Sequence, residues 1–464
     1  MTEVSKTIDR LLTFKNSQGQ SARGTLLRMT RSGVVFEVYN PYSIIQLSEV
    51  LQELTVLRSG APIYSGKAVV SSLVNTGLML IVSATLVDRW NDLTFLLSRS
   101  DDLKSEVEHF ISDWEKSKRI RPGYQLAVGE LRSFLSQLSP WLDQIDIASF
   151  DDPDRVPENV VMQIKDPLIP KVVEIQQLFE SEARLIGEDE LEAHRMYAQR
   201  DLLPLMMRAP FFHRSYTKPL GYAGDYMMVK MMVEGKRKGP TTYARLVNDF
   251  YLNIDLVRAH KNRLKILERR LTELAGQAEA QGKRISILNV GCGPAIEIVR
   301  FIQNSQLCER CDFHLIDFNA ETIEYARQAI ETATREAGRS PSIKYTQKSV
   351  HSLLKRSSSN KKYSERQYDF VYCAGLFDYL SDRVCQRLLD LFCDWTNISG
   401  SVMATNVHPD NPTRLIMEHV IDWHLIHRTM KDLASLAPAQ YSKFVFDDDT
   451  HMNVFMEISV SEIE

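Results

Sequence analysis

The sequence predicts an α/β protein in which a seven-stranded, mostly parallel sheet covered by helices is preceded by a small β-barrel and a helical connector. In the last third of the chain, apolar strand-like runs alternate with helical segments, an order that builds a sheet buried on both faces. Residues 20–90 instead carry short β-branched runs separated by glycine. Between about 100 and 210, apolar residues recur three and four positions apart, as in helices. We therefore expect a barrel in residues 1–98, a helical connector and lid in 99–244, and the sheet domain in 245–464.

Length, charge and hydropathy restrict the class of protein. The 464 residues exceed a single hydrophobic core, which stops growing near roughly 250–300 residues. With 56 basic and 60 acidic side chains, no overall positive field attracts nucleic acid or an anionic bilayer. The first residues lack an apolar run behind a basic start, and no stretch approaches the ~20 apolar residues that span a bilayer. We expect a cytoplasmic protein that neither spans a membrane nor binds nucleic acid.

The six cysteines all lie in the C-terminal part, which argues against a disulfide framework. Cys308 and Cys311 form a Cys-x-x-Cys pair. A zinc site would need two further ligands at suitable spacing, and the sequence has no second pair. We therefore expect no metal site, and interpret the pair as two small buried side chains before a strand.

The β-branched runs near the N-terminus predict a small antiparallel barrel. Its expected strands span residues 24–27, 33–39, 66–74 and 77–82. This stretch resembles PilZ domains, barrels that in many bacterial proteins bind cyclic di-GMP through an Arg-x-x-x-Arg arm and an Asp/Asn-x-Ser-x-x-Gly turn. If Gly33 is aligned with the glycine of that turn, Thr30 falls on the serine and Arg28 on the acid, and residues 1–27 contain no Arg-x-x-x-Arg. Without paired guanidinium groups to grip phosphates, we expect the barrel to serve regulation or contacts, with cyclic di-GMP an unlikely ligand.

The connector has two segments with clear helical periodicity, residues 107–116 and 126–138. Two prolines and a charge run in residues 149–157 predict a loop or boundary there.

The sheet domain has seven expected strands, of which the last two are close enough to form a hairpin. They span residues 285–290, 312–317, 342–347, 368–374, 400–406, 443–448 and 452–460. A doubly wound, Rossmann-like sheet that ends in an antiparallel hairpin resembles the class I fold of methyltransferases that depend on S-adenosylmethionine (SAM). The resemblance covers about residues 245–460.

A glycine motif follows the first of these strands. Gly291 and Gly293 allow the backbone to turn sharply and approach a ligand, while the next helix directs free N–H groups and its positive dipole end toward a carboxylate. A dinucleotide-binding motif would have a third glycine at Ile296. This difference, together with the Gly-Cys-Gly-Pro string, favours SAM over NAD as the cofactor.

Three further segments complete the expected cofactor site. Asp317, at the end of the second strand, can accept both ribose hydroxyls, although it or Asn319 could instead cap the next helix. Ser349 lies where many relatives have an acid that accepts the adenine amino group, and Ala374 with Gly375 leaves room beside the sulfonium. The predicted cofactor-binding residues are Asn289, Gly291, Cys292, Gly293, Pro294, Asp317, Phe318, Ser349, Val350, Ala374, Gly375 and Leu376.

Three strings suggest the acceptor: residues 218–226 (KPLGYAGDY), 374–380 (AGLFDYL) and 422–429 (DWHLIHRT). Together they resemble a bacterial family linked to the synthesis of 3-hydroxypalmitic acid methyl ester, an extracellular signalling lipid. The resemblance implies a carboxyl O-methyltransferase for a hydroxy fatty acid or its thioester. A carboxylate is already nucleophilic at pH 7, so alignment and a cationic or hydrogen-bonding clamp suffice, whereas other acceptors would need a general base.

Three residues are candidates for catalysis. Tyr222 and Asp225 lie in a glycine-punctuated turn suited to a lid, with a plain turn capped by Asp225 as the alternative. His408 follows the fifth strand at the edge of the sheet where ligands bind, as a base, an acceptor-binding group or a loop-stabilising residue.

Two further groups of side chains allow two interpretations each. One comprises His419, Trp423, His424 and His427, expected on one helix as a pocket wall or packing surface rather than a metal site. The other comprises Arg258, His260 and Arg263, which either clamp an acidic substrate or belong to a solvated helix face.

A regulatory protein that binds SAM and acts through the barrel with little or no turnover is the alternative function. Methylation of RNA gains no support from the net charge of −4. Amine acceptors are disfavoured because no Asn-Pro-Pro-Tyr string follows the fourth strand.

Overall fold

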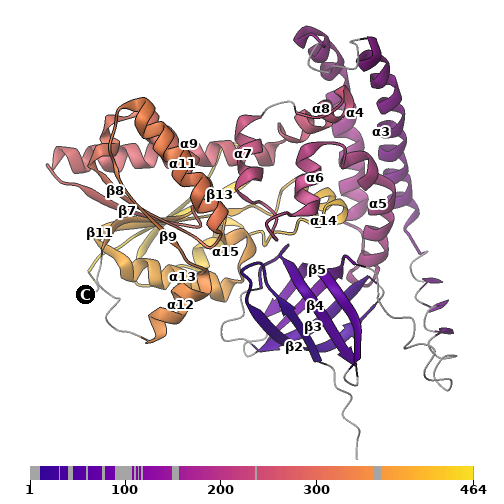
Figure 1. The fold of residues 1–464 in the computed structure, drawn as a ribbon, viewed down its shortest axis with the longest axis horizontal. Helices are drawn as coiled ribbons and strands as arrows, with labels where there is room; N and C mark the ends of the chain where they lie inside the picture. The colour runs from indigo at the N-terminus through magenta and orange to yellow at the C-terminus, as the bar shows by residue number, and fades with distance from the viewer. Residues whose placement is uncertain are drawn as a thin grey trace, which may run out of the picture.

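The computed structural model contains a barrel, a set of helices and a seven-stranded sheet (Figure 1). In Figure 1 the barrel lies beneath the other two parts, and helices α6 and α7 lie between the α3–α5 helices and the sheet. The structure describes residues 11–30, 32–39, 45–58, 61–75, 79–88, 107–108, 111–112, 114–115, 119–148, 156–235, 238–359 and 367–462.

The predicted barrel is confirmed, and it is closed by six antiparallel strands in the order β1-β2-β3-β6-β5-β4. The strands are β1 (Leu11–Lys15), β2 (Ser21–Met29), β3 (Gly33–Tyr39), β4 (Val50–Arg58), β5 (Ala61–Asn75) and β6 (Met79–Leu86). Strands β1 and β4 were not expected. In β4 a bulge between Leu51 and Leu54 places both side chains in the barrel core, although they are three residues apart. The sequence of β4 therefore lacks the regular alternation of apolar and polar residues that identifies a strand.

The helical region packs around a core of large aromatic side chains. It contains α3 (Pro122–Ala148), α4 (Glu158–Ala183), η2 (Glu188–Glu190), α5 (Leu191–Met206), α6 (Pro210–Thr217), α7 (Tyr226–Glu234), α8 (Thr242–Tyr251) and α9 (Asp255–Ala280). Tyr124, Phe179, Phe212 and Tyr243 are fully buried in this core. The helix expected at 126–138 lies within α3. Residues 107–108, 111–112 and 114–115, which belong to the helix expected at 107–116, are helical, whereas most of the break expected at 149–157 falls outside the described residues.

The sheet has the order β12-β13-β11-β10-β7-β8-β9. Its strands are β7 (Ile285–Val290), β8 (Cys311–Asp317), β9 (Ser342–Gln347), β10 (Tyr368–Cys373), β11 (Thr396–Val407), β12 (Ser442–Asp447) and β13 (Asn453–Ser459). Strands β7 to β11 pair in parallel, whereas β13 is antiparallel to both β11 and β12. This arrangement confirms the predicted class I methyltransferase fold. The chain reverses its direction of winding between β7 and β10, and ligands bind at such a switch point beside the carboxyl ends of the strands.

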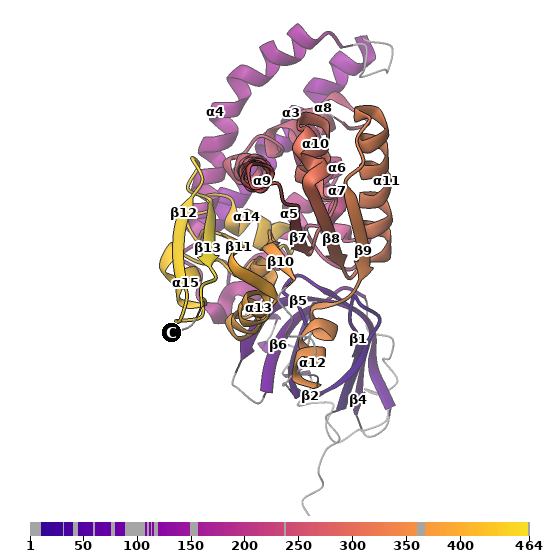
Figure 2. The same cartoon turned by 90° about the vertical axis from the view of Figure 1, so that its left-hand side faces the viewer.

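Helices cover both faces of the sheet because its central strands are apolar on both sides (Figure 2). In β7, Ile285 and Ile287 pack with α9, α10 (Ile296–Asn304) and α11 (Ala320–Ala337). Leu288 and Val290 contribute to the core under α12 (Val350–Ser359), α13 (Asp382–Trp395) and α15 (Met430–Ser435). Short elements η3 (Gln306–Arg310), η5 (Phe377–Tyr379) and α14 (Arg414–Val420) connect these layers.

The prediction of a single helix carrying His419, Trp423, His424 and His427 is wrong. Helix α14 ends at Val420, and the chain is irregular until α15. Asp422 adopts a positive φ of 50°. The N–H groups of Ile426 and Arg428 then donate to Asp378 and Val407 rather than to helical partners, so the segment follows the carboxyl edge of the sheet.

All six cysteines are buried free thiols, in agreement with the packing role expected for Cys308 and Cys311. The helices that the structure describes include none that is long and apolar enough to cross a membrane. Over the same part of the chain, no cluster of three or more His, Cys, Asp or Glu side chains could hold a metal ion.

Candidate active site

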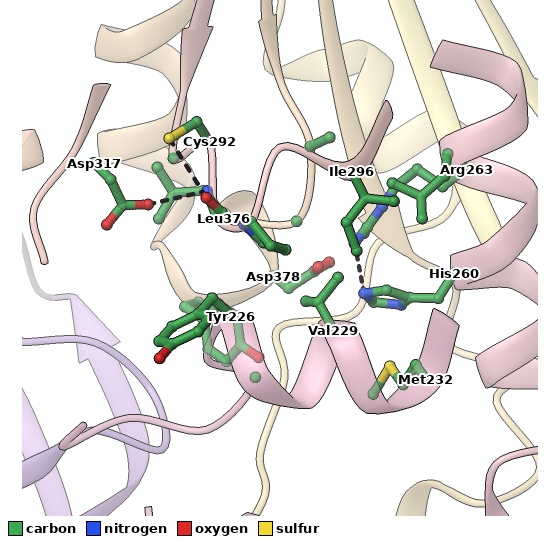
Figure 3. A pocket seen from close by; sticks show the side chains of 18 of the residues that line it. Tyr226, Val229, Met232, His260, Arg263, Cys292, Ile296, Asp317, Leu376 and Asp378 are labelled. Atoms are coloured by element: carbon green, nitrogen blue, oxygen red, sulfur yellow. Dashed lines mark hydrogen bonds between the residues drawn. The ribbon is translucent and has the colours of Figure 1, made fainter. Parts of the chain in front are cut away.

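A cavity of about 1180 Å³, partly open to solvent, lies at the carboxyl edge of the sheet beside the switch point. Its walls come from the loops after β7, β8 and β10, from α7 and α9, from the segment after α14, and from one residue of the barrel. In Figure 3, Asp317 and Cys292 lie on one side of this cavity, His260 and Arg263 on the other, and Asp378 and Val229 between them.

The loop after β7 is shaped by its two glycines. Gly291 and Gly293 have φ angles of 71° and 52°, in the left-handed region that favours glycine. A Cβ atom added to Gly293 would meet no atom within 4 Å. Helix α10 then begins after Ala295, whose side chain provides no cap for the first N–H groups. This loop can therefore approach a ligand closely with its backbone, and the helix end favours a negatively charged group.

Asp317 lies at the end of β8, beside this loop, and lines the cavity. One carboxylate oxygen accepts from the Gly293 N–H at 3.1 Å and the other from the Asn319 N–H at 3.0 Å. Burial raises the pKa of Asp317, while these backbone donors act in the opposite direction. Asn319, rather than Asp317, caps α11 by accepting from the Thr322 N–H at 2.9 Å. The carboxylate of Asp317 is thus left at the cavity wall, where a ribose could reach its oxygens.

Beneath the glycine loop, Asn289, Glu297 and Tyr372 form a buried network. The Asn289 amide donates to Glu297 at 3.0 Å and to Tyr372 at 2.9 Å, and the Tyr372 hydroxyl donates to Glu297 at 2.8 Å. Burial raises the pKa of Glu297. Asn289 lines the cavity, but its amide N–H groups are used inside the protein, so its main contribution is to support the loop. Glu297 and Tyr372 were not predicted, because each lies in an otherwise apolar element.

The loop after β10 brings Ala374, Gly375 and Leu376 to the cavity and continues into η5. Gly375 has a φ of 98°, and a Cβ atom there would lie 3.0 Å from both terminal nitrogens of Arg263. The buried Arg428 holds the loop from behind by donating to the Phe377 carbonyl at 2.8 Å and the Leu380 carbonyl at 2.7 Å.

The structure separates the two interpretations of the basic residues on α9. Arg258 is exposed and pairs with Asp255 at 2.7 Å, as on a solvated helix face. Arg263 is only 5% exposed and lines the cavity. Its Nη2 lies 2.5 Å from His260 Nε2, and its Nη1 has no hydrogen-bond partner within the described part of the chain. Burial and Arg263 lower the pKa of His260 well below its usual value, so the imidazole is neutral.

The glycine-punctuated turn before α7 forms another wall. Tyr222 lines the cavity with its ring centroid 5.1 Å from that of Phe318, and burial raises its pKa well above the usual value. Gly224 packs closely against the Tyr379 hydroxyl, which would have to move if a side chain were added there. Asp225 is not part of the cavity lining. It caps α7 by accepting from the Met228 N–H at 3.0 Å, and it pairs with Arg214 at 2.8 Å.

Three other predicted site residues lie outside the cavity lining. His408 Nδ1 accepts from the Asp410 N–H at 3.3 Å, an arrangement that stabilises the loop after β11. Ser349 caps α12 by accepting from the Ser352 N–H at 3.2 Å. Val350 begins α12 and is buried in the sheet core. The structure thus brings Tyr222 and the predicted residues of the β7, β8 and β10 loops together, but not Asp225, His408, Ser349 or Val350.

The rest of the cavity wall includes residues that sequence analysis did not name as site residues, namely Gln46, Tyr226, Val229, Met232, Leu256, Asp378, Tyr379 and Leu425. It also includes Trp423, for which a pocket wall was one of two expectations. Most are apolar or aromatic residues in amphipathic segments. The sequence pattern of such a segment is the same whether its apolar side chains pack in a core or line a cavity.

Comparison with protein-family models gave no match, and comparison with curated proteins gave none either. Solved structures of similar fold include a protein of Bordetella parapertussis described as a possible exported protein, at 17% identity and a TM-score of 0.40, covering 64% of this chain and 97% of that one. An O-methyltransferase family protein from Burkholderia thailandensis is 12% identical with a TM-score of 0.33, over 60% of this chain and 74% of that one. Magnesium protoporphyrin IX methyltransferase from Synechocystis PCC 6803, with bound S-adenosylhomocysteine (SAH), is 10% identical with a TM-score of 0.30, over 45% and 85% respectively. These similarities are too low to assign an activity, and the fold assignment rests on the strand order.

Proposed function

We propose that this chain is a SAM-dependent methyltransferase that methylates a carboxylate oxygen of a lipid-like acceptor, such as a hydroxy fatty acid. The observation that carries the proposal is the cavity that the glycine loop, Asp317 and Arg263 line together, with Arg263 Nη1 lacking a hydrogen-bond partner among the described residues. Such a site offers one region for a nucleoside with a charged tail and another for an anionic acceptor.

The residues on the β7 and β8 side fit SAM. The open space over Gly293 and the uncapped start of α10 suit the methionine carboxylate, and Asp317 suits the ribose hydroxyls. Tyr222 and Phe318 offer aromatic surface beside Asp317 for the nucleoside. When bound there, SAM supplies an electrophilic methyl group.

The buried cation on the acceptor side favours an acceptor that is already an anion. The Nε2 of the neutral His260 faces the Arg263 guanidinium and is not free to act as a base. Burial raises the pKa of the Tyr379 phenol, which therefore remains protonated and able to donate a hydrogen bond. Asp378 is buried and accepts from the Val407 N–H at 2.7 Å. Arg263 is thus a buried cation at the cavity wall, which suits an anion that is already nucleophilic.

Apolar cavities that share wall residues with the first one support a lipid-like tail. A second cavity of about 350 Å³ shares Met232, Leu256 and Trp423 with the first, and apolar or aromatic side chains form nearly all of its wall. A third, of about 550 Å³ between α3, α4 and α8, shares Tyr251 with the second. Burial of each methylene group contributes about 0.8 kcal/mol, so even part of this path would favour a long acyl chain.

The proposal is tested by incubating the purified protein with methyl-labelled SAM and carboxylic acids of increasing chain length, including 3-hydroxyoctanoate and 3-hydroxypalmitate. We expect labelled methyl esters that extract into organic solvent, with the long acid preferred. Micromolar binding of SAH without transfer to any of these acids would instead support the regulatory alternative. Absence of SAH binding by the folded protein would contradict both.

Narrowing the apolar path should change the preferred chain length. In Met232→Trp, the larger side chain enters the space shared by the first two cavities. We expect kcat/KM for 3-hydroxypalmitate to fall about tenfold, equivalent to about 1.4 kcal/mol, with little change for 3-hydroxyoctanoate. Met196→Trp, on the exposed side of α5, is the control and should change neither value. An equal loss for both acids would contradict an acyl path past Met232.

A further inference from the structure

The barrel contributes a side chain, Gln46, to the cavity of the sheet domain. Gln46 is 4% exposed, and its Nε2 has no hydrogen-bond partner among the residues that the structure describes. A buried amide donor without a partner is unfavourable because it has lost its water without gaining another acceptor. An acceptor atom of a bound ligand would satisfy this donor.

Contacts on the C-terminal side of Gln46 attach the barrel to three walls of the cavity. The Leu47 N–H donates to the Tyr379 carbonyl at 3.4 Å, and the Val50 N–H donates to the Gly221 carbonyl at 2.6 Å. The Ser48 hydroxyl donates to the His424 carbonyl at 3.0 Å and accepts from the His424 N–H at 2.5 Å. Gln46 is thus held against the loop after β10, the turn before α7 and the segment after α14.

The barrel also fixes the backbone of Gln46 from its own side. The carboxylate of Glu49, which is fully buried, accepts from the Gln46 N–H at 2.7 Å. The same carboxylate accepts from the N–H and the hydroxyl of Ser17 at 2.7 Å and 2.6 Å. This network holds the loop in place before a ligand binds, an arrangement that lowers the entropy lost on binding.

We propose that Gln46 is an acceptor-binding residue whose Nε2 donates a hydrogen bond to an oxygen of the methyl acceptor, so that the barrel completes the acceptor site. Its loop is attached at Tyr379 and His424 to walls other than the glycine loop and Asp317, which fit the cofactor, and at Gly221 to the turn that also carries Tyr222. A neutral amide donor in the same cavity as the Arg263 cation suits an acceptor with several oxygens, such as a hydroxylated carboxylic acid. This inference rests on the proposed methyltransferase function and adds a specificity role for the barrel.

The test compares Gln46→Met, which keeps the length of the side chain without the donor, with Gln46→Glu, which places an anion beside the acceptor. Gln52→Met, on β4 of the same barrel and outside the cavity lining, is the matched control. For each protein, KM and kcat with 3-hydroxypalmitate, the Kd for SAH and the melting temperature are measured. We expect Gln46→Met to raise KM for 3-hydroxypalmitate about tenfold and Gln46→Glu to raise it further, with the Kd for SAH within twofold of wild type.

The outcomes distinguish this inference from the proposed function. Unchanged KM in Gln46→Met, in a wild-type background that transfers methyl groups, overturns the role of Gln46 and leaves the methyltransferase proposal intact. A raised Kd for SAH with unchanged KM also overturns it, because Gln46 would then contact the cofactor. Wild-type protein that binds SAH without methylating any carboxylic acid overturns the acceptor proposal and this inference together.

Discussion

Gly291→Arg is expected to lower the affinity for SAH by at least about 100-fold while leaving the protein folded. The added side chain starts 3.5 Å from Leu376, at the point where the loops after β7 and β10 meet, and must extend into the space proposed for the cofactor. At a φ of 71° the substitution also introduces backbone strain of roughly 1–2 kcal/mol. Calorimetric titration with SAH measures the loss of affinity, and the melting temperature reports the effect of the backbone strain on stability.

Gly338→Arg is a matched control for this strain. Gly338 has a φ of 62° at the end of α11 and faces open space away from the cavity, so arginine there should lower the melting temperature without changing SAH binding.

Asp317→Ala should weaken SAH binding by about 30–100-fold, because it removes the acceptor of two charge-assisted hydrogen bonds worth about 2–3 kcal/mol together. Wild-type affinity in either cavity variant would contradict the proposed cofactor site.

Arg263→Met should have the largest effect on turnover of a carboxylate acceptor. Removal of a buried cation that pairs with an anion costs about 3–5 kcal/mol, so we expect kcat/KM for 3-hydroxypalmitate to fall by at least about 100-fold. The Kd for SAH should stay within about threefold of wild type, because the glycine loop and α10 are the proposed site of the methionine carboxylate. Arg263→Lys should recover part of the activity, since lysine retains the charge but not the planar pair of donors.

Arg258→Met serves as the control for Arg263, because Arg258 lies on the same helix but is exposed and paired with Asp255. It should retain wild-type activity and SAH affinity. A large loss of SAH binding in Arg263→Met with unchanged KM for the acceptor would show that Arg263 holds the cofactor instead. Equal losses in the Arg258 and Arg263 variants would indicate a general effect on α9.

The sheet domain was predictable because its signals are local. Strand β7 is a mostly apolar run, and the glycine motif follows it directly, so strand, turn and helix are encoded within a few residues. The barrel was less predictable, because the bulge in β4 interrupts the alternation that identifies a strand. The segment after α14 was misread as helix because its partners, Asp378 and Val407, come from other parts of the chain.

The two sides of the candidate site also differ in how far the sequence predicts them. The cofactor side follows from short motifs, since Gly291, Gly293 and Asp317 act through backbone conformation and strand order that adjacent residues specify. The acceptor side depends on packing between distant segments. Arg258 and Arg263 have similar sequence surroundings, yet only Arg263 is buried at the cavity, and Gln46 reaches it only because the barrel docks on Tyr379, Gly221 and His424. Burial and long-range contacts, which a local pattern does not encode, select which of several similar polar side chains can meet a substrate.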